Sequence, residues 1–368
     1  MAFPSRILPL AFVAAFLSAA AGLAQEGAAP QVGPTAPENT GLPPALTPPG
    51  NFPFNPGAPF GQPPRGFLSG ANGNEDDGGG NFVRMEGGGF INEDLVRTAR
   101  EVASHSVDHA TGQRFEVPTW SNPPAFEKDV FTFARIVFKA GIGNVPGDYN
   151  RGKRIGWWVD FPDADLNLSY RLQQLTSTRT DPDGRVLKLT DPDLTNFPFI
   201  FMEHPGYMRL RDAELAALRK YLLNGGALVV IDFWNQREWD GFETEMARVL
   251  PGRKWTDIDT DHPLFTCVYD LRRPMAQLQV PTMQFWLRAG QPENLVPLTT
   301  DVRGPGSETM HVRALLDDKD RIMAIAFHNT DISDGWEREG ESDAYFRRFS
   351  EKISYPLGIN ILFYLMTH

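Results

Sequence analysis

Cysteine is almost absent from this chain, since Cys267 is the only one in 368 residues. A single cysteine excludes an intramolecular disulfide and any metal cluster built from several thiolates, so the folded state must be stabilised by its apolar core. No cysteine lies near the N-terminus, where it could accept a lipid anchor. Cys267 itself lies in an apolar run, and we expect a buried, inert thiol.

Several sequence motifs of catalysis are also missing. The chain has no Gly-x-Ser-x-Gly nucleophile elbow, no phosphate-binding glycine loop and no dinucleotide-binding fingerprint. These absences argue against a serine hydrolase of the elbow type, a P-loop nucleotide hydrolase and a nicotinamide- or flavin-dependent enzyme.

Basic residues are outnumbered, with 35 lysines and arginines against 46 acidic residues and a net charge of -11. An acidic chain of this kind argues against nucleic acid or an anionic lipid surface as its partner. Long hydrophobic runs are missing as well, because the apolar runs at residues 7–21 and 359–366 are too short to span a bilayer.

The first apolar run follows Arg6 and precedes the small residues Gly22 and Ala24, which is typical of a secretory signal peptide. We predict a signal peptide over residues 1–24, with an uncleaved anchor as the alternative. Cleavage removes only the charge of Arg6, so the net charge of the mature chain becomes -11 - 1 = -12. We expect an exported protein in the periplasm or at the cell surface, without a transmembrane span in the mature chain.

Proline is concentrated near the N-terminus, where twelve of the 31 prolines lie between Pro30 and Pro64. Two glycine triplets follow, and such a composition cannot bury enough apolar surface to fold. We predict a disordered linker over residues 25–88, whose Phe-Pro pairs either bind a partner or, more simply, belong to a spacer. Residues 89–129 form an extension with a short helix at 93–104, and residues 130–368 form the packed domain.

Residues 212–234 indicate the fold class. Leu215, Leu218 and Leu222 recur at helical spacing, two glycines stop the helix, and residues 227–231 read as a buried strand. This is half of a βαβ unit, and the same alternation extends along the domain. The other predicted strands are residues 130–138, 155–159, 186–189 and 197–202, and further helices begin at Pro162 and span 241–250. A hairpin at 310–316 and 322–327 follows, then helices at 345–352 and 357–366 broken at Pro356.

Polar residues follow these strands, and ligands of open α/β sheets bind outside the carboxyl ends of the strands. Asp232, His204 and His262 are the catalytic candidates. The predicted ligand-binding residues are Glu203, Trp234, Asp331, Asp334 and Trp336.

Imidazole and carboxylate groups together suit a divalent cation, for which His262, His328 and Asp331 are the first candidates. Asp331 and Asp334 are equally typical of a turn in which the side chains bond to their own backbone. The aromatic rings of Trp157, Trp158 and Trp234 could stack on sugars, although core packing is their commoner use.

Five motifs resemble a known family. They read NFPFIFMEHPG, LRKYLLNGGALVVIDFW, DHPLFTCVYDL, HNTDISDGWEREGE and YPLGINILFYLMTH, and they resemble the bacterial domain-of-unknown-function family 4159 from about Phe131 to the C-terminus. The resemblance implies a flavodoxin-like three-layer α/β sandwich, similar to class I glutamine amidotransferases and ThuA-like proteins. It places the amidotransferase nucleophile at Phe233, where the chain has no cysteine, and leaves Asp212 rather than Arg211 to cap the helix.

Besides a carbohydrate-binding domain that uses Trp157, Trp158 and Trp234, two functions remain open at this point. The first is a nucleophile-less binding or assembly module of the bacterial envelope, with an envelope protein or a glycan as partner. The second is a metal-assisted hydrolase or sugar-modifying enzyme in which His204, Asp232, His262 and Asp331 gather at the strand ends.

Overall fold

The computed structural model describes residues 82–84, 90–103, 117–126, 129–141, 156–295 and 303–368, all within one compact unit of the chain, Pro48–His368. The predicted signal peptide and residues 25–81 of the predicted linker lie outside the described residues. Within that linker, β1 (Phe82–Arg84) pairs antiparallel with β2 (Phe90–Asn92), so regular structure already occurs before residue 88.

A seven-stranded sheet forms the centre of the fold, with the order β5-β3-β6-β8-β11-β10-β9. The strands are β3 (Ala134–Val137), β5 (Arg185–Lys188), β6 (Phe199–Glu203), β8 (Ala227–Phe233), β9 (Trp255–Asp257), β10 (His311–Leu316) and β11 (Ile322–His328). Strands from β5 to β11 in this order are parallel, whereas β10 runs antiparallel to both β11 and β9. The predicted α/β fold, its mostly parallel sheet and its hairpin are therefore confirmed.

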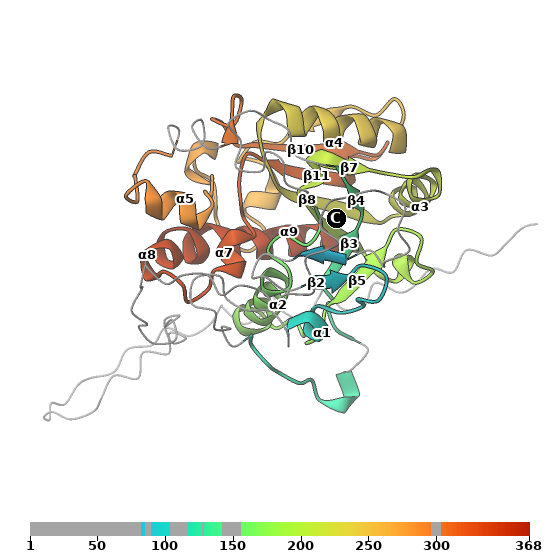
Figure 1. Cartoon of the computed structure of the whole chain (residues 1–368), viewed down its shortest axis with the longest axis horizontal. Helices are drawn as coiled ribbons and strands as arrows, with labels where there is room; N and C mark the ends of the chain where they lie inside the picture. The colour runs from blue at the N-terminus through green and yellow to red at the C-terminus, as the bar shows by residue number, and fades with distance from the viewer. Residues whose placement is uncertain (1–81, 85–89, 104–116, 127–128, 142–155, 296–302) are drawn as a thin grey trace, which may run out of the picture. The chain divides into compact units, whose positions relative to one another are not determined.

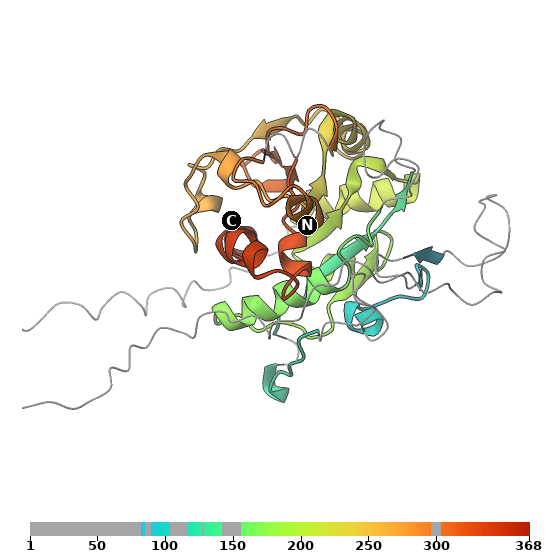
Figure 2. The ribbon, with the colours of Figure 1, turned by 60° about the vertical axis from the view of Figure 1, so that its left-hand side comes forward.

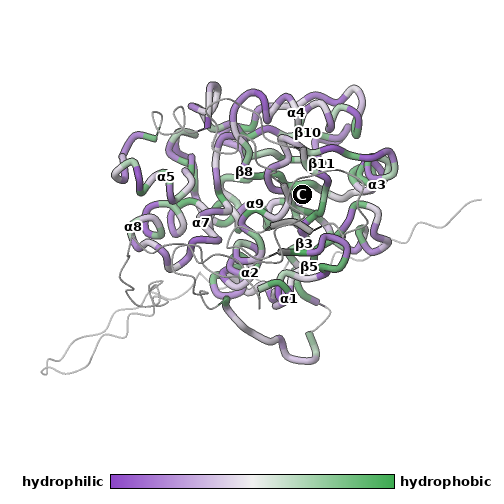
Figure 3. The backbone as a smooth tube through the Cα atoms, viewed as in Figure 1, coloured by the Kyte–Doolittle hydropathy of each residue, from purple (hydrophilic) through white to green (hydrophobic). Residues whose placement is uncertain are grey.

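The middle strands are apolar because the protein covers them on both faces. Every residue of β6, β8 and β11 is buried, as continuous apolar runs in a parallel sheet predict. Figure 3 shows hydrophobic residues along β8 and β3 and hydrophilic ones over much of α4.

Helices lie on the two faces of this sheet. The longer helices are α2 (Asp163–Leu175), α3 (Asp212–Leu223), α4 (Asn235–Val249) and α9 (Tyr355–Thr367). α2 packs against α9 and the short α7 (Asp334–Glu337), and α3 packs beside α4. Figures 1 and 2 show α4 on the opposite side of β8 and β11 from α9.

Shorter elements connect these parts. They are α1 (Ala99–Ala103), α5 (Met283–Arg288), α8 (Asp343–Tyr345), the paired β4 (Lys139–Ala140) and β7 (Met208–Arg209), and the 3-10 turns η2 (Pro124–Phe126), η3 (Leu194–Asn196), η4 (Pro205–Tyr207), η5 (Pro263–Phe265) and η6 (Met275–Gln277). Among the helices of the described part, none has the length and apolar character needed to cross a membrane.

Three local predictions were wrong. Residues 157–162 form turns rather than a strand. The N-terminal helix is only α1, because Asn92 accepts the backbone N–H of Asp94 in a turn instead of capping a helix there. α4 begins at Asn235, whose Oδ1 accepts the N–H groups of Arg237 and Glu238, whereas the prediction began at Gly241.

The C-terminal helices are not broken at Pro356. A π-helix, η7 (Phe346–Ser354), continues directly into α9, in which Pro356 is the second residue. Proline is tolerated in the first turn of a helix because its missing N–H would have no partner there. The cap predicted for Asp212 is also wrong: its side chain is fully exposed, and Glu214 accepts the N–H of Arg211 instead.

Candidate functional site

Neighbouring strands leave the carboxyl edge of the sheet through left-handed residues. His204 follows β6 with φ 49°, Asp232 near the end of β8 has φ 50°, and Asn329 follows β11 with φ 61°. Non-glycine residues in this region are uncommon and cluster at functional sites. The chain therefore turns sharply at the same edge three times and brings polar side chains together there.

His204 and Asp232 form a buried ion pair, with 2.6 Å between His204 Nε2 and Asp232 Oδ2. The other oxygen of Asp232, Oδ1, accepts a hydrogen bond of 2.8 Å from Trp234 Nε1. Burial alone lowers the pKa of His204, but the Asp232 carboxylate outweighs it and raises that pKa above 6.5. Burial opposes ionisation of Asp232, yet protonated His204 and Arg303 bring its pKa below 3.8.

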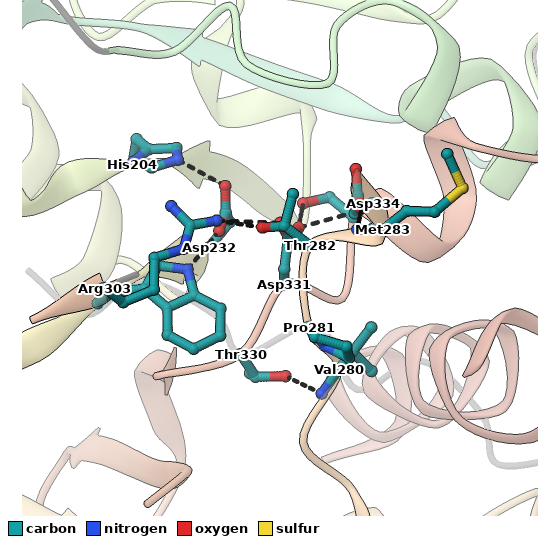
Figure 4. A network of polar contacts seen from close by, with 12 residues as sticks. His204, Asp232, Val280, Pro281, Thr282, Met283, Arg303, Thr330, Asp331 and Asp334 are labelled. Carbon is teal, nitrogen blue, oxygen red and sulfur yellow. Dashed lines mark hydrogen bonds and ion pairs between the residues drawn. The ribbon is translucent and has the colours of Figure 1, made fainter. Parts of the chain in front are cut away.

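Arg303 connects this pair to Asp331. Its Nη2 lies 3.6 Å from Asp331 Oδ2, and its guanidinium carbon lies 4.8 Å from the centre of the Trp234 ring. Thr282 Oγ1 accepts a hydrogen bond from Arg303 and donates one of 2.8 Å to Asp331 Oδ2. Figure 4 shows the His204–Asp232 pair beside the contacts of Arg303, Thr282, Asp331 and Asp334.

Asp160, Asp331 and Asp334 form what we call the buried acidic group. One carboxylate oxygen from each lies within 4.8 Å of the others, and the three residues are 3%, 2% and 1% exposed. Asp331 Oδ1 accepts the backbone N–H of Asp334 at 3.0 Å, which is the predicted local turn. Asp334 also accepts the N–H of Met283 and, at 3.1 Å, Nε of Arg338.

Arg135 of β3 positions the turn that carries Asp160. Its Nη1 donates to the carbonyl oxygens of Trp157 and Val159 at 2.9 and 3.0 Å. The same guanidinium pairs with Asp165 of α2 and with Glu203 of β6. These contacts join segments far apart in the sequence, so Asp160, Arg135 and Arg303 were missed from the sequence, although Asp160 directly follows an expected strand.

Glu203, a predicted ligand-binding residue, is 1% exposed at the end of β6. Arg135 Nη2 donates to its Oε1 at 2.9 Å, whereas its Oε2 has no hydrogen-bond partner in the described part of the chain. Burial raises the pKa of Glu203 to about 7, against the opposing effect of Arg135.

The structure does not bring His262 and His328 into this network. His262 Nδ1 accepts the N–H of Leu264 at 3.2 Å, and its ring packs against Tyr364 of α9. His328 Nε2 lies 3.0 Å from the carbonyl oxygen of Asn235, and burial lowers its pKa to about 3, so the ring is neutral. The predicted cation set is therefore corrected: Asp331 groups with Asp160 and Asp334 instead of with the two histidines.

Four candidate tryptophans are buried. Trp157, Trp158, Trp234 and Trp336 are 0%, 6%, 1% and 0% exposed, which favours core packing over stacking on a sugar. Cys267, in contrast, is exposed, so the expectation of a buried thiol was wrong. Its pKa is raised by partial burial, and its Sγ donates to the carbonyl oxygen of Asn360 at 3.2 Å.

At the end of β8, Phe233 and Asp232 have different roles. The ring of Phe233 is fully buried against Trp239 and Phe242, so Phe233 belongs to the core. Asp232, one position earlier than the expected nucleophile position, has a left-handed backbone. The side chain at this edge is therefore a carboxylate whose two oxygens are both bound.

The family to which the chain belongs follows from its sequence profile. Residues 148–366 match a family described as a domain of unknown function, DUF4159. No curated protein matches the chain. Since the matched residues make up more than half of the chain, this protein is a member of the DUF4159 family.

Proposed function

We propose that the chain is a ligand-binding or assembly module of the bacterial envelope, built on a flavodoxin-like, class I glutamine amidotransferase-like fold without a covalent nucleophile. The order of the parallel strands supports the fold. Along the chain, the five parallel strands come in the order β3, β5, β6, β8 and β11. Across the sheet, their order is β5-β3-β6-β8-β11, so the first two strands have exchanged places. This 2-1-3-4-5 order is that of flavodoxin-like sheets.

The geometry at the end of β8 supports the proposal that the site has no nucleophile. Phe233 is turned into the core, and both oxygens of Asp232 are engaged by His204 and Trp234. A nucleophile must be free to approach the substrate and be activated by a base. Asp232 is instead a fixed charge that orients His204.

Two polar atoms at the same edge favour binding of a polar ligand. Glu203 Oε2 and His204 Nδ1 are buried and have no hydrogen-bond partner in the described residues. Buried polar atoms nearly always have a partner, so a ligand that supplies a donor and an acceptor here would satisfy both. An envelope protein or a glycan has such groups, and the predicted signal peptide and linker favour this location.

Turnover assays on the full chain test the absence of catalysis. We expect no hydrolysis of amide, ester or glycoside substrates above the rate of the blank, and no difference between the wild type and Asp232→Asn. Turnover that Asp232→Asn abolishes, and that the exposed control Asp261→Asn retains, would overturn the proposal.

A metal-assisted hydrolase is the second candidate function, and Arg303 is the observation that favours it. Arg303 pairs with Asp331 and stacks on Trp234, which donates to Asp232 of the His204–Asp232 pair, so a general acid, a cationic side chain and a carboxylate lie close together. The raised pKa of His204 suits a general acid at neutral pH. This candidate predicts hydrolysis that a chelator stops, that a divalent cation restores, and that His204→Gln slows.

A further inference from the structure

We propose that Asp160, Asp331 and Asp334 bind one hard divalent cation, such as calcium, magnesium or manganese, at the carboxyl edge of the sheet. The cation would join the turn before α2, which contains Asp160, to the chain after β11, where Asp331 precedes α7 and Asp334 is the first residue of α7. The site does not depend on whether the protein is a binding module or an enzyme.

The spacing of the oxygens fits a shared ion. Calcium–oxygen distances are about 2.3–2.6 Å, so two oxygens on opposite sides of one calcium ion lie about 4.6–5.2 Å apart. In the buried acidic group the candidate oxygens lie within 4.8 Å of one another. Three carboxylates from two separate segments therefore already lie close enough to share an ion.

Asp160 supplies an independent indication of a ligand. Its Oδ2 is buried and has no hydrogen-bond partner among the described residues. The acidic side chains of Glu337, Asp331, Glu203 and Asp334 all face Asp160. A carboxylate buried without a partner is strongly destabilising, so either a proton or a cation must neutralise it.

The positive charges of nearby arginines do not neutralise the negative charge of the buried acidic group. Arg303 lies 3.6 Å from Asp331, and Arg338 lies 3.1 Å from Asp334. Arg338 is shared with Glu337 at 2.6 Å and Glu341 at 3.2 Å. Two arginines thus pair with four carboxylates, and Asp160 adds a fifth, so a divalent cation beside Asp160 would offset most of the excess negative charge.

The ligand chemistry selects the class of cation. All three side chains offer carboxylate oxygen, and among the described residues neither histidine nor cysteine belongs to the group. Oxygen-only sites prefer calcium, magnesium and manganese, whereas zinc and copper prefer nitrogen or sulfur ligands. Water or a bound ligand would complete the coordination shell.

Asp160→Asn is the discriminating variant, because asparagine tolerates the left-handed backbone of Asp160, with φ 56°. For the metal-stripped wild-type full chain, we expect calcium, magnesium or manganese to raise the thermal unfolding midpoint saturably, by about 5–10 °C at a hundredfold excess over Kd. Asp160→Asn should lose this rise, yet unfold without cation at the same midpoint as the wild type or higher. The exposed control Asp261→Asn should respond like the wild type.

Metal content provides a second readout for an ion that binds too tightly to strip. Wild-type protein denatured after purification should release one equivalent of a hard cation, and Asp160→Asn should release none. The proposal is overturned if the wild type neither holds a cation nor responds to one. An equal response of the wild type and Asp160→Asn also overturns it, because the cation then binds elsewhere.

Discussion

The pair of His204 and Asp232 is shielded from solvent, because both side chains are nearly inaccessible to water, at 4% and 2% exposure. Removing one partner of a buried pair leaves an uncompensated charge, at a cost of about 3–5 kcal/mol. The pair also has a defined pH range. The contribution of His204 is complete below pH 6.5 and is lost as the pH rises through its raised pKa, and that of Asp232 is lost as the pH falls below 3.8.

We therefore expect Asp232→Asn to lower the free energy of unfolding by about 3–5 kcal/mol between these two pH limits, and by less at higher pH, where His204 is neutral. Urea unfolding across the pH range measures this. Glu238 and Arg303 also face His204, but the substitution leaves both in place.

Asp270 supplies the matched control, because its ion pair with Arg272 is of equal length, 2.6 Å, but exposed. Asp270→Asn should leave the stability unchanged, since solvent screens exposed pairs. A loss for Asp232→Asn that is the same at every pH would show that the pair is not ionised.

The contribution of Glu203 to the free energy of unfolding depends on pH in the opposite way to that of Asp232, because the pKa of Glu203 is raised to about 7 in the folded state. The native protein then holds a proton that the unfolded chain releases above pH 4.5, so stability falls as the pH rises from 4.5 to 7. Glu203→Gln should remove this part of the fall, on the order of 3 kcal/mol, while its amide oxygen still accepts from Arg135. Arg135, Asp165 and Asp232 face Glu203, and the comparison of variant with wild type cancels their own titration. Identical pH profiles for the two proteins would contradict the raised pKa.

At the scale of elements, the contact of α4 with η4 depends on a glycine. A Cβ on Gly241 would lie 2.2 Å from the backbone oxygen of Gly206, which is far inside contact distance. Alanine is otherwise the better helix former by about 1 kcal/mol. The close approach of the two backbones therefore requires glycine at position 241 of α4.

We expect Gly241→Ala to lower the free energy of unfolding by about 1–3 kcal/mol, because the added methyl group separates α4 from η4. Chemical denaturation measures the change, and Thr244→Ala, at an exposed position of the same helix, is the control. If Gly241→Ala were as stable as that control, the two elements would have to pack more loosely than described.

Local sequence patterns predicted those elements whose signals are themselves local. The helical leucines and the glycine stop predicted α3 and β8, and the acidic turn at 317–320 predicted the hairpin of β10 and β11. The predicted strand at 155–159 was wrong because Arg135, from β3, binds the carbonyl oxygens of Trp157 and Val159. Those two carbonyls face a side chain from another element, which no local pattern reveals.

At the scale of the whole molecule, the order of the strands predicts where the fold is most resistant to opening. β8 lies between β6 and β11 and is buried throughout, whereas β9 ends the order of the sheet, with Thr256 and Asp257 exposed. We expect hydrogen exchange to be slowest in β8 and its two neighbours and fastest, among the strands of this sheet, in β9. Exchange of β9 amides as slow as that of β8 would show that another segment covers this edge.

Local patterns in the sequence were enough to predict the α/β fold class, the family and the residues that follow the strand ends: Glu203, His204, Asp232, Trp234, Asp331 and Asp334. They were enough because apolar periodicity and turn chemistry act between near neighbours in the chain. The packing of distant segments, in contrast, leaves His262 and His328 outside the network and brings Asp160 and Arg303 into it. A buried charge is set by what surrounds it in space, and those surroundings come from strands and loops that are distant in sequence.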